Sequence, residues 1–340
     1  MCAERRGTSP EPELTATRCL VTGATGFVGR ALVTRLRAAG AFVRGIARSP
    51  SRAMDAHELV AADLAQLPED AAAFDGIDVV FHLAAKTHDM AEARGVESEY
   101  ERINVEGTRR LLAAARGHSV RRIVFVSSVK AIDEGNDVPA TEETPTQPLT
   151  PDGRSKLEAE RLVMAAASGG AFDAVCLRFP LVYGGGQRGN LQRMIDAIDR
   201  GRFPPPPANG NRRSMLHVQN AVDALVLAGE QPAAANQVYI VTDASAYSTR
   251  VVYEAACAAL EREPARWHVP EWAFRALASG GDLARRILGR RIGFDSDAFQ
   301  KLLGSAAYDS TRVQRELGYK PYYDLVASMP TLVAERGARG

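Results

Sequence analysis

The chain has little of the chemistry that marks secreted or metal-binding proteins. Its 340 residues include only four cysteines, none of them in a C-x-x-C pair: Cys2, Cys19, Cys176 and Cys257. The six histidines are not spaced like metal ligands either. This pattern argues against a disulfide framework and predicts no metal site, and scattered thiols are typical of a reducing compartment. We therefore expect a cytoplasmic protein that holds no metal.

Long apolar runs and an excess of charge are also missing. No apolar run reaches eighteen residues, and the charged, proline-bearing N-terminus predicts a disordered tail over residues 1–16 rather than a signal peptide or membrane span. The 42 Lys and Arg nearly balance the 41 Asp and Glu, for a net charge of +1. This balance gives no general attraction for nucleic acid or membranes, so phosphate must be bound locally.

What the chain does have is a regular alternation of short apolar segments with segments of helical periodicity. Hydrophobic residues make up 46% of the chain, enough for a large core. Strands are predicted at residues 19–22, 42–47, 58–62, 79–83, 123–126 and 174–178, and helices after residue 29, around 105–115 and at 154–167. This alternation predicts an α/β fold with a Rossmann-type, doubly wound parallel sheet.

The alternation loosens after Arg178. Residues 184–186 and the prolines at 204–207 indicate loops, one more strand is predicted at 238–241, and the remainder is mostly helical. We predict a Rossmann domain from residues 17–180 plus about 215–245, and a smaller, mixed C-terminal substrate lobe from residues 181–214 and 246–340.

A glycine-rich turn follows the first predicted strand and leads into a helix. Gly23, Gly26 and Gly29 stand in G-x-x-G-x-x-G spacing. The first glycine permits a tight turn, the second lets the backbone approach a pyrophosphate, and the third allows close packing of helix and strand. The N–H groups at the start of the helix face the anion. The turn therefore predicts a site for NAD or NADP.

The end of the second strand bears on the choice between these two cofactors. An acidic residue there would accept the 2′-hydroxyl of NAD. The strand instead ends in Ala47-Arg48-Ser49, and arginine pairs well with a 2′-phosphate. Arg48 therefore favours NADP, while an arginine that stacks on adenine or is simply solvated remains the alternative.

Residues 22–29, Thr-Gly-Ala-Thr-Gly-Phe-Val-Gly, closely resemble the cofactor loop of the extended short-chain dehydrogenase/reductase family, and further motifs follow in that family's order. The resemblance covers roughly residues 18–325. It implies that the cofactor is contacted by Gly23, Thr25, Gly26, Phe27, Val28, Gly29, Arg48, Ser49, Asp63, Leu64, Leu83, Ala84, Ala85, Thr87, Asn104, Lys156 and Pro180.

Within this family the pattern is most similar to UDP-glucose and UDP-N-acetylglucosamine 4-epimerases and to 4-ketohexose reductases. The segments Arg-Gly-Asn at 188–190 and Asn-Arg-Arg-Ser at 211–214 resemble the family's substrate-lobe signatures. The resemblance implies a UDP-hexose whose diphosphate is held by Asn190 and Arg213, which suits the forked guanidinium of arginine. It also implies a homodimer.

The family's reaction uses a serine, a tyrosine and a lysine. By match these positions are Ser128, which would also contact substrate, Asp152 and Lys156, so an aspartate stands where the tyrosine belongs. Free aspartate has a pKa of about 4 and tyrosine of about 10, so the carboxylate is a weak base and a poor proton donor. Aspartate is also shorter. We expect impaired turnover and retained cofactor binding. An Asp152–Lys156 pair at helical spacing is also an ordinary structural salt bridge, which is the alternative interpretation of these two residues.

Three readings of the aspartate stay open. The chain is an epimerase-type enzyme altered at one position, or a non-catalytic relative that binds NAD(P) and a nucleotide sugar, or another residue such as Tyr183 or His88 carries the proton. An NADP-dependent ketoreductase of a different carbonyl compound is a further alternative. A 4,6-dehydratase is disfavoured because Val129-Lys130 follows the serine, where that class carries an Asp-Glu pair.

Overall fold

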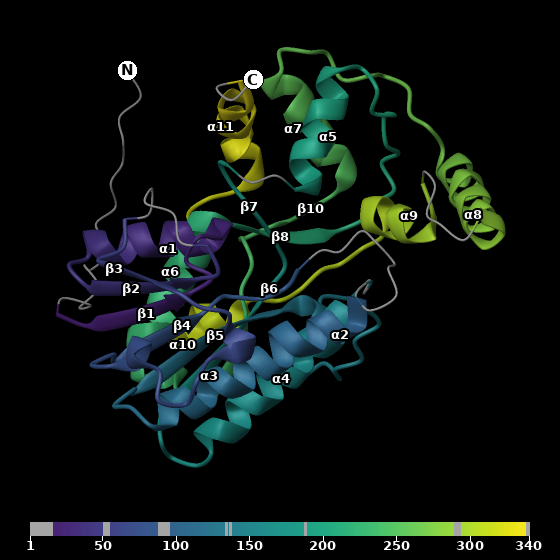
Figure 1. Ribbon diagram of the computed structural model, residues 1–340. Coiled ribbons are helices and arrows are strands. Elements are labelled where there is room, and N and C mark those ends of the chain that lie inside the picture. Colours follow the sequence, from purple (N-terminus) through teal and green to yellow (C-terminus); the bar gives the residue numbers. More distant parts are fainter. Residues whose placement is uncertain are drawn as a thin grey trace, which may run out of the picture.

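The computed structural model describes residues 16–49, 55–87, 96–132, 135, 138–186, 189–288 and 294–337. Its main feature is a seven-stranded sheet in the order β3-β2-β1-β4-β5-β6-β9, with every neighbouring pair parallel (Figure 1). The strands are β1 (Arg18–Thr22), β2 (Phe42–Ala47), β3 (Glu58–Ala61), β4 (Val79–His82), β5 (Arg122–Ser128), β6 (Asp173–Phe179) and β9 (Gln237–Ile240). The predicted Rossmann-type α/β fold is confirmed.

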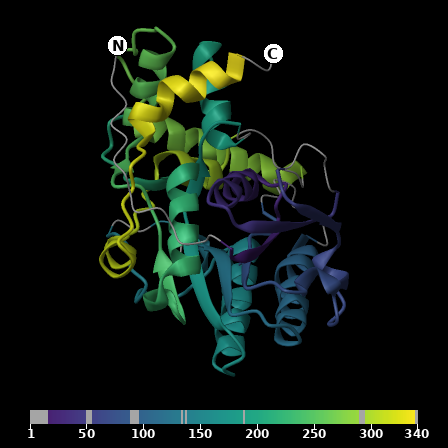
Figure 2. The same cartoon turned by 90° about the vertical axis from the view of Figure 1, so that its left-hand side faces the viewer.

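Helices cover both faces of this sheet because its strands are apolar on both sides. On one face, α1 (Phe27–Ala38) and α6 (Val218–Glu230) bury Leu32, Leu36 and Leu225 against the sheet. On the other, α3 (Gly107–Arg116) and α4 (Pro151–Ala167) bury Leu111 and Val163. Figure 2 shows the sheet between these two layers. Before α3 the chain runs through α2 (Val96–Tyr100) and a π-helical segment, Glu101–Glu106.

The helix α4 begins at Pro151, three residues before the predicted start at 154. Proline is favoured in the first turn of a helix, where its missing N–H costs nothing, and the Thr150 hydroxyl caps the helix by accepting a hydrogen bond from Gly153 N at 3.1 Å. The earlier start places Asp152 inside the first turn of the helix, and the expectation of a start at 154 was wrong for that reason.

The smaller lobe is built on a three-stranded mixed sheet, β10-β8-β7. Its strands, which the sequence did not predict, are β7 (Leu181–Tyr183), β8 (Arg213–His217) and β10 (Ala246–Tyr247). The helices α5 (Asn190–Asp199), α7 (Thr249–Ala259) and α11 (Leu325–Gly337) enclose a separate apolar cluster, and α8 (Glu271–Leu288) packs on α9 (Ser296–Leu303) (Figure 1).

The last part of the chain departs from the predicted lobe boundaries. The helix α10 (Thr311–Leu317) contacts β9, and Val313, Leu317 and Tyr319 belong to the same buried cluster as the strands of the large sheet. The Tyr239 hydroxyl also donates to Glu316 Oε2 at 2.9 Å. This segment lies with the Rossmann domain, although residues 246–340 were assigned as a whole to the substrate lobe.

The helices of the described part of the chain include none with the length and apolar character needed to cross a membrane.

Candidate active site

The predicted cofactor residues gather at one edge of the large sheet. Parallel strands bring their carboxyl ends to the same edge, and the chain order changes direction between β1 and β4, where such folds bind ligands. The glycine turn follows β1, Arg48 and Ser49 follow β2, Asp63 and Leu64 follow β3, Leu83 to Thr87 follow β4, Ser128 ends β5, and Pro180 follows β6.

The glycine turn fits a dinucleotide for steric reasons. A Cβ on Gly23, whose φ is +67°, would lie 2.8 Å from Ala84 N, and a Cβ on Gly29 would lie 2.2 Å from Gly23 O. A Cβ on Gly26 would meet only the turn's own Gly23 O, at 3.1 Å. The turn is therefore packed tightly against the loop after β4 and the start of α1, and Gly26 meets only the turn's own backbone.

Asp63 lies at the end that would hold adenosine, between two arginines. Its Oδ1 accepts from Ala65 N at 3.1 Å and its Oδ2 from Arg102 Nη1 at 3.1 Å. The pKa of Asp63 is lowered, because the Ala65 hydrogen bond and the charges of Arg102 and Arg48 outweigh its slight burial. Arg48 and Ser49 are exposed. A carboxylate and two guanidinium groups therefore border this end of the site.

Asn104 holds two parts of the site together. It lies buried in the π-helical segment, a rare geometry that is often found at functional sites. Its Oδ1 accepts from Lys86 N at 2.7 Å, and its Nδ2 donates to Lys86 O at 3.1 Å and to Ser155 Oγ at 2.8 Å. Asn104 thereby fixes the loop after β4 to the first turns of α4.

Lys156 is buried on α4, beside β5. Its Nζ donates to Val126 O at 3.0 Å and lies 5.3 Å from the centre of the Phe125 ring. Burial lowers the pKa of Lys156 to about 8, and the Asp152 carboxylate partly counters that effect. Burial, with a contribution from Lys156, also lowers the pKa of His82 to about 3, so His82 is neutral.

Asp152 and Lys156 do not form the salt bridge that their helical spacing allows. Asp152 Oδ2 instead accepts from Lys130 Nζ at 3.1 Å, while Lys156 is turned to the Val126 carbonyl and interacts with Asp152 only electrostatically. The sequence shows the helical spacing of 152 and 156 but not the turn after β5 that carries Lys130. The other carboxylate oxygen, Oδ1, is buried without a hydrogen-bond partner among the described residues.

Ser128 ends β5 and begins the short 3-10 turn Val129–Ala131. Its Oγ accepts from Lys130 N at 3.2 Å, which leaves the hydroxyl hydrogen for another partner. Ser128, Lys130 and Asp152 thus form a connected group, with Lys156 on the same helix as Asp152.

Tyr183 does not serve as the missing proton carrier. It is fully buried, its hydroxyl donates to Asp243 Oδ2 at 2.7 Å, and burial together with the Asp243 charge raises its pKa far above the ordinary value. His88, the other candidate, lies outside the described residues.

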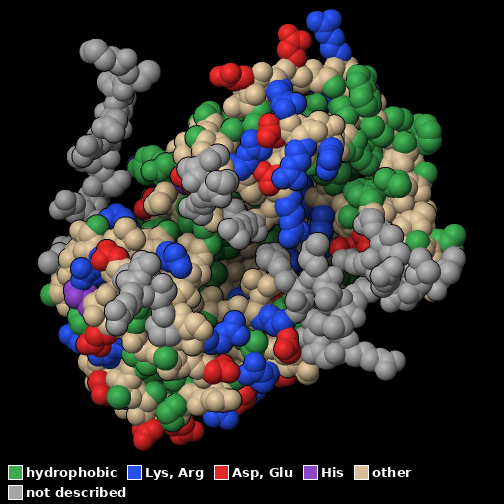
Figure 3. All heavy atoms as spheres, turned by 45° about the horizontal axis from the view of Figure 1, so that its top comes forward, with side chains coloured by type: hydrophobic (Ala, Val, Ile, Leu, Met, Phe, Trp, Pro, Cys, Tyr) green, Lys and Arg blue, Asp and Glu red, His purple; other side chains and the backbone are tan. Residues whose placement is uncertain are grey.

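The two predicted diphosphate ligands belong to the smaller lobe. Asn190 is exposed at the first residue of α5. Arg213 begins β8, and its Nη1 donates to Gln300 O at 3.2 Å and to Gly304 O at 2.9 Å, which fixes the guanidinium against the end of α9. Figure 3 shows a hollow between the lobes with Lys and Arg side chains on both sides, as an anionic ligand requires.

Comparison with known families agrees with this architecture. Residues 19–242 match the model of the NAD dependent epimerase/dehydratase family. The chain belongs to this family.

Known proteins match the chain over most of its length. The chain is 29% identical over 307 residues to a UDP-glucose 4-epimerase of Vibrio cholerae, covering 89% of this chain and 90% of that protein. It is 30% identical over 316 residues to a 4-hydroxy-2-methyl-3-oxo-4-farnesyl-3,4-dihydroquinoline-1-oxide ketoreductase of Stigmatella aurantiaca, covering 85% of this chain and 92% of that protein.

A solved structure gives the same picture in three dimensions. The structure of MoeE5 in complex with UDP-glucose and NAD superposes with a TM-score of 0.73 at 28% identity, covering 94% of this chain and 99% of that one. The predicted resemblance to the nucleotide-sugar epimerases is thereby confirmed.

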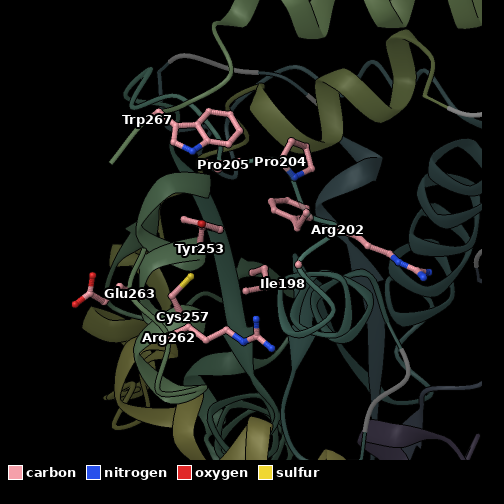
Figure 4. Close-up of a pocket in the computed structure, with 11 residues that line it drawn as sticks. Ile198, Arg202, Pro204, Pro205, Tyr253, Cys257, Arg262, Glu263 and Trp267 are labelled. Carbon is pink, nitrogen blue, oxygen red and sulfur yellow. The ribbon is translucent and has the colours of Figure 1, made fainter. Parts of the chain in front are cut away.

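This epimerase/dehydratase family member also has a pocket that the sequence did not indicate. It has a volume of about 480 Å³ and lies in the smaller lobe between the end of α5, residues 201–205 and α7 (Figure 4). Phe203 and Tyr253 stack at 6.2 Å on its wall, and Trp267 and Arg262 border it. None of the predicted site residues lines this pocket, so it is distinct from the hollow at the edge of the sheet.

Lys130 is the residue of the site that the sequence motifs did not single out. In the sequence, Lys130 is notable only because it lies two residues after Ser128, at a position where a 4,6-dehydratase carries an acidic residue. The contact with Asp152 requires the packing of α4 on the 129–131 turn, which no linear motif encodes.

Proposed function

We propose that the chain is an NAD(P)-dependent nucleotide-sugar 4-epimerase-type enzyme that acts by transient oxidation at C4 of a UDP-hexose. The observation that carries this proposal is that Ser128 and Asp152 both bond to Lys130, with Lys156 four residues after Asp152 on α4. Figure 3 adds the Lys and Arg side chains on both sides of the hollow between the lobes. The UDP-glucose 4-epimerase relative and the MoeE5 complex support the choice of substrate.

In this proposal the chain's own residues orient the sugar and handle its proton. When bound, the dinucleotide supplies the hydride chemistry at C4. The Ser128 hydroxyl donates to the C4 oxygen, Lys156 holds the ribose hydroxyls of the cofactor with its remaining N–H groups, and Asn190 and Arg213 bind the diphosphate. A carboxylate at 152 is too short and too weak a base to replace a phenol, so turnover is impaired.

Several finer features are part of the proposal. Arg48 favours NADP over NAD, since an arginine that follows β2 suits a 2′-phosphate. The protein acts in the cytoplasm, and it forms a homodimer like its extended family members. Nucleic acid and membranes are not its partners.

Restoring the tyrosine tests the proposal directly. Asp152→Tyr is expected to raise kcat for UDP-glucose epimerisation by roughly 10-fold or more, because a phenol is longer than the carboxylate and a better matched acid–base. The parent protein should bind NAD(P) and UDP-glucose about as tightly as the variant, measured by calorimetry. A tyrosine variant that binds no UDP-sugar and turns none over would contradict the sugar assignment.

A ketoreductase is the second candidate, because a relative of that activity covers 85% of this chain. It would reduce a carbonyl compound with no nucleotide attached, and it makes no use of Asn190 and Arg213. The Arg213→Met substitution separates the two, since it should raise the KM for a UDP-sugar at least tenfold and leave ketone reduction unchanged. The third candidate, a non-catalytic binding relative, predicts retained ligand binding and no turnover in the tyrosine variant.

A further inference from the structure

Lys130 stands outside the family's serine, tyrosine and lysine set, yet it contacts two members of the group. Its backbone N–H donates to Ser128 Oγ at 3.2 Å, and its Nζ donates to Asp152 Oδ2 at 3.1 Å. The Lys130 side chain is 26% exposed and that of Asp152 only 11%, so the lysine is the more accessible of the two.

The backbone holds this pair in place as well. A Cβ on Gly153 would lie 2.4 Å from Lys130 O, so only a glycine allows the first turn of α4 to sit this close to the 129–131 turn. The residue after Asp152 is therefore packed on the backbone of Lys130. The contact between the two side chains is built into the way α4 meets β5.

The ammonium compensates for two deficits of an aspartate in this position. A carboxylate ends nearer the helix than a phenol does, and Lys130 Nζ extends the polar group by one hydrogen bond, about 3 Å. Free lysine has a pKa of about 10.4, close to that of about 10 for tyrosine and far from that of about 3.9 for aspartate. Lysine is therefore the better match to the proton affinity of the phenol that is missing.

We propose that Lys130, held by Asp152, is the proton carrier of this site and takes the part played by the tyrosine in related enzymes. This rests on the proposed function, in that a sugar or ketone oxygen must reach the group. On reduction, one N–H bond of the Lys130 ammonium breaks and an O–H bond forms on the substrate oxygen, as its carbon is reduced by NAD(P)H. The neutral amine still donates to Asp152 Oδ2. On oxidation, the amine lone pair takes the hydroxyl proton.

Asp152 then acts as a positioning residue. One of its oxygens orients Lys130, and the other, Oδ1, is a buried acceptor without a partner among the described residues. An unpaired buried acceptor destabilises a protein, so a ligand hydroxyl that donates to this oxygen removes that cost. Lys156, four residues after Asp152 on α4, interacts electrostatically with the same carboxylate.

The test compares Lys130→Met in two backgrounds. In the parent, Lys130→Met is expected to lower kcat for UDP-glucose by roughly 100-fold with little change in KM. In the Asp152→Tyr background, where a phenol is present, it should change kcat by less than about threefold. Lys130→Arg keeps the charge but cannot release its proton, so it should be as slow as Lys130→Met. Lys320→Met, at an exposed lysine, is the matched control.

A second readout does not depend on turnover. The extent of acetylation of Lys130 by acetic anhydride, measured by mass spectrometry of its peptide, should fall at least fivefold when NAD(P) and UDP-glucose are bound, while Lys320 stays equally labelled. Equal labelling of Lys130 with and without the two ligands overturns the proposal.

The remaining outcomes are separable. Loss of activity to the same degree in both backgrounds, or rescue by Lys130→Arg, shows that Lys130 is structural or only a charge, and the proposal fails. An inactive parent beside an active Asp152→Tyr variant keeps the proposed function and overturns the role of Lys130. If calorimetry shows that neither form binds a UDP-sugar, the proposed function is wrong. The proposed role of Lys130 is then wrong as well, because it rests on that function.

Discussion

Single residues determine whether the site can exist. Gly29 has no room for a side chain, and Lys156 carries an ammonium in a buried place. Both are matched to the family's motifs by sequence, but the reason for each lies in its surroundings: Gly23 O stands against Gly29, and the Val126 carbonyl and the Phe125 ring surround Lys156.

Gly29→Ala should unfold or strongly destabilise the cofactor turn. Its Cβ would lie 2.2 Å from Gly23 O, a backbone atom that cannot move without opening the turn. We expect a loss of at least about 2 kcal/mol in the free energy of unfolding and of NAD(P) binding. Gly280→Ala in α8 is the control, since nothing lies within 4 Å of its Cβ, and alanine there should gain about 0.5–1 kcal/mol. If Gly29→Ala and Gly280→Ala change the free energy of unfolding equally in urea titrations, the steric explanation for Gly29 is wrong.

Lys156 makes stability depend on pH. Burial lowers its pKa from 10.5 to about 8, so the folded protein binds fewer protons than the unfolded chain between these values, and stability rises with pH across that window. The loss of folding stability caused by burying the Lys156 ammonium, about 3 kcal/mol, is fully present below pH 8. The gain in Tm from Lys156→Met should therefore be largest at pH 7 and shrink toward pH 10. A gain that stays constant or grows with pH argues against a buried ammonium.

At the scale of elements, the site depends on how α4 is fixed to the sheet. The Arg178 side chain on β6 donates through Nη2 to Glu160 Oε1 at 2.5 Å and through Nε to Glu160 Oε2 at 3.1 Å. Both side chains are only about 5% exposed. This buried pair and the close contact at Gly153 hold the two ends of the helix segment that carries Asp152 and Lys156.

Breaking the pair at one end should be costly. Arg178→Met leaves the Glu160 carboxylate buried without its partner, and we expect the free energy of unfolding to fall by about 3–5 kcal/mol. The double variant Arg178→Met/Glu160→Leu should recover most of that loss, because no charge then stays buried. Urea unfolding of the parent, Arg178→Met, Glu160→Leu and the double variant measures the coupling between the two side chains. A double variant as unstable as the sum of the single ones means that packing, not charge, dominates.

At the scale of the whole molecule, the order of the strands collects loops from distant parts of the sequence into one edge. The smaller lobe then covers that edge, and α10 joins the end of the chain to the large sheet. The net charge of the chain is +1, and Figure 3 shows Lys and Arg side chains on both sides of the hollow between the lobes.

Cofactor binding should raise the Tm of the protein, and the size of the increase should show whether NAD or NADP binds more tightly. A ligand at 100 times its Kd stabilises the folded state by about 2.7 kcal/mol, so at equal concentration the tighter dinucleotide gives the higher Tm. We expect NADP to raise Tm more than NAD, and Arg48→Ala to remove the difference. A higher Tm with NAD in the parent protein contradicts the preference for NADP.

The sequence by itself determined the α/β class, the positions of the strands of the large sheet, and the family. These follow from local causes: apolar runs of strand length, glycine spacing in one turn, and motifs in a fixed order. Even the aspartate at 152 was visible without a structure, since the lysine four residues later marks the position.

The tertiary structure alone decided which groups meet. The partner of Asp152 is Lys130 because α4 packs on the turn after β5, a contact between segments 22 residues apart. Three other features likewise need contacts between distant segments of the chain. They are the Tyr183–Asp243 hydrogen bond, the small mixed sheet, and the packing of α10 against the large sheet. Such contacts depend on packing in three dimensions rather than on local pattern, so periodicity and spacing carry no signal for them.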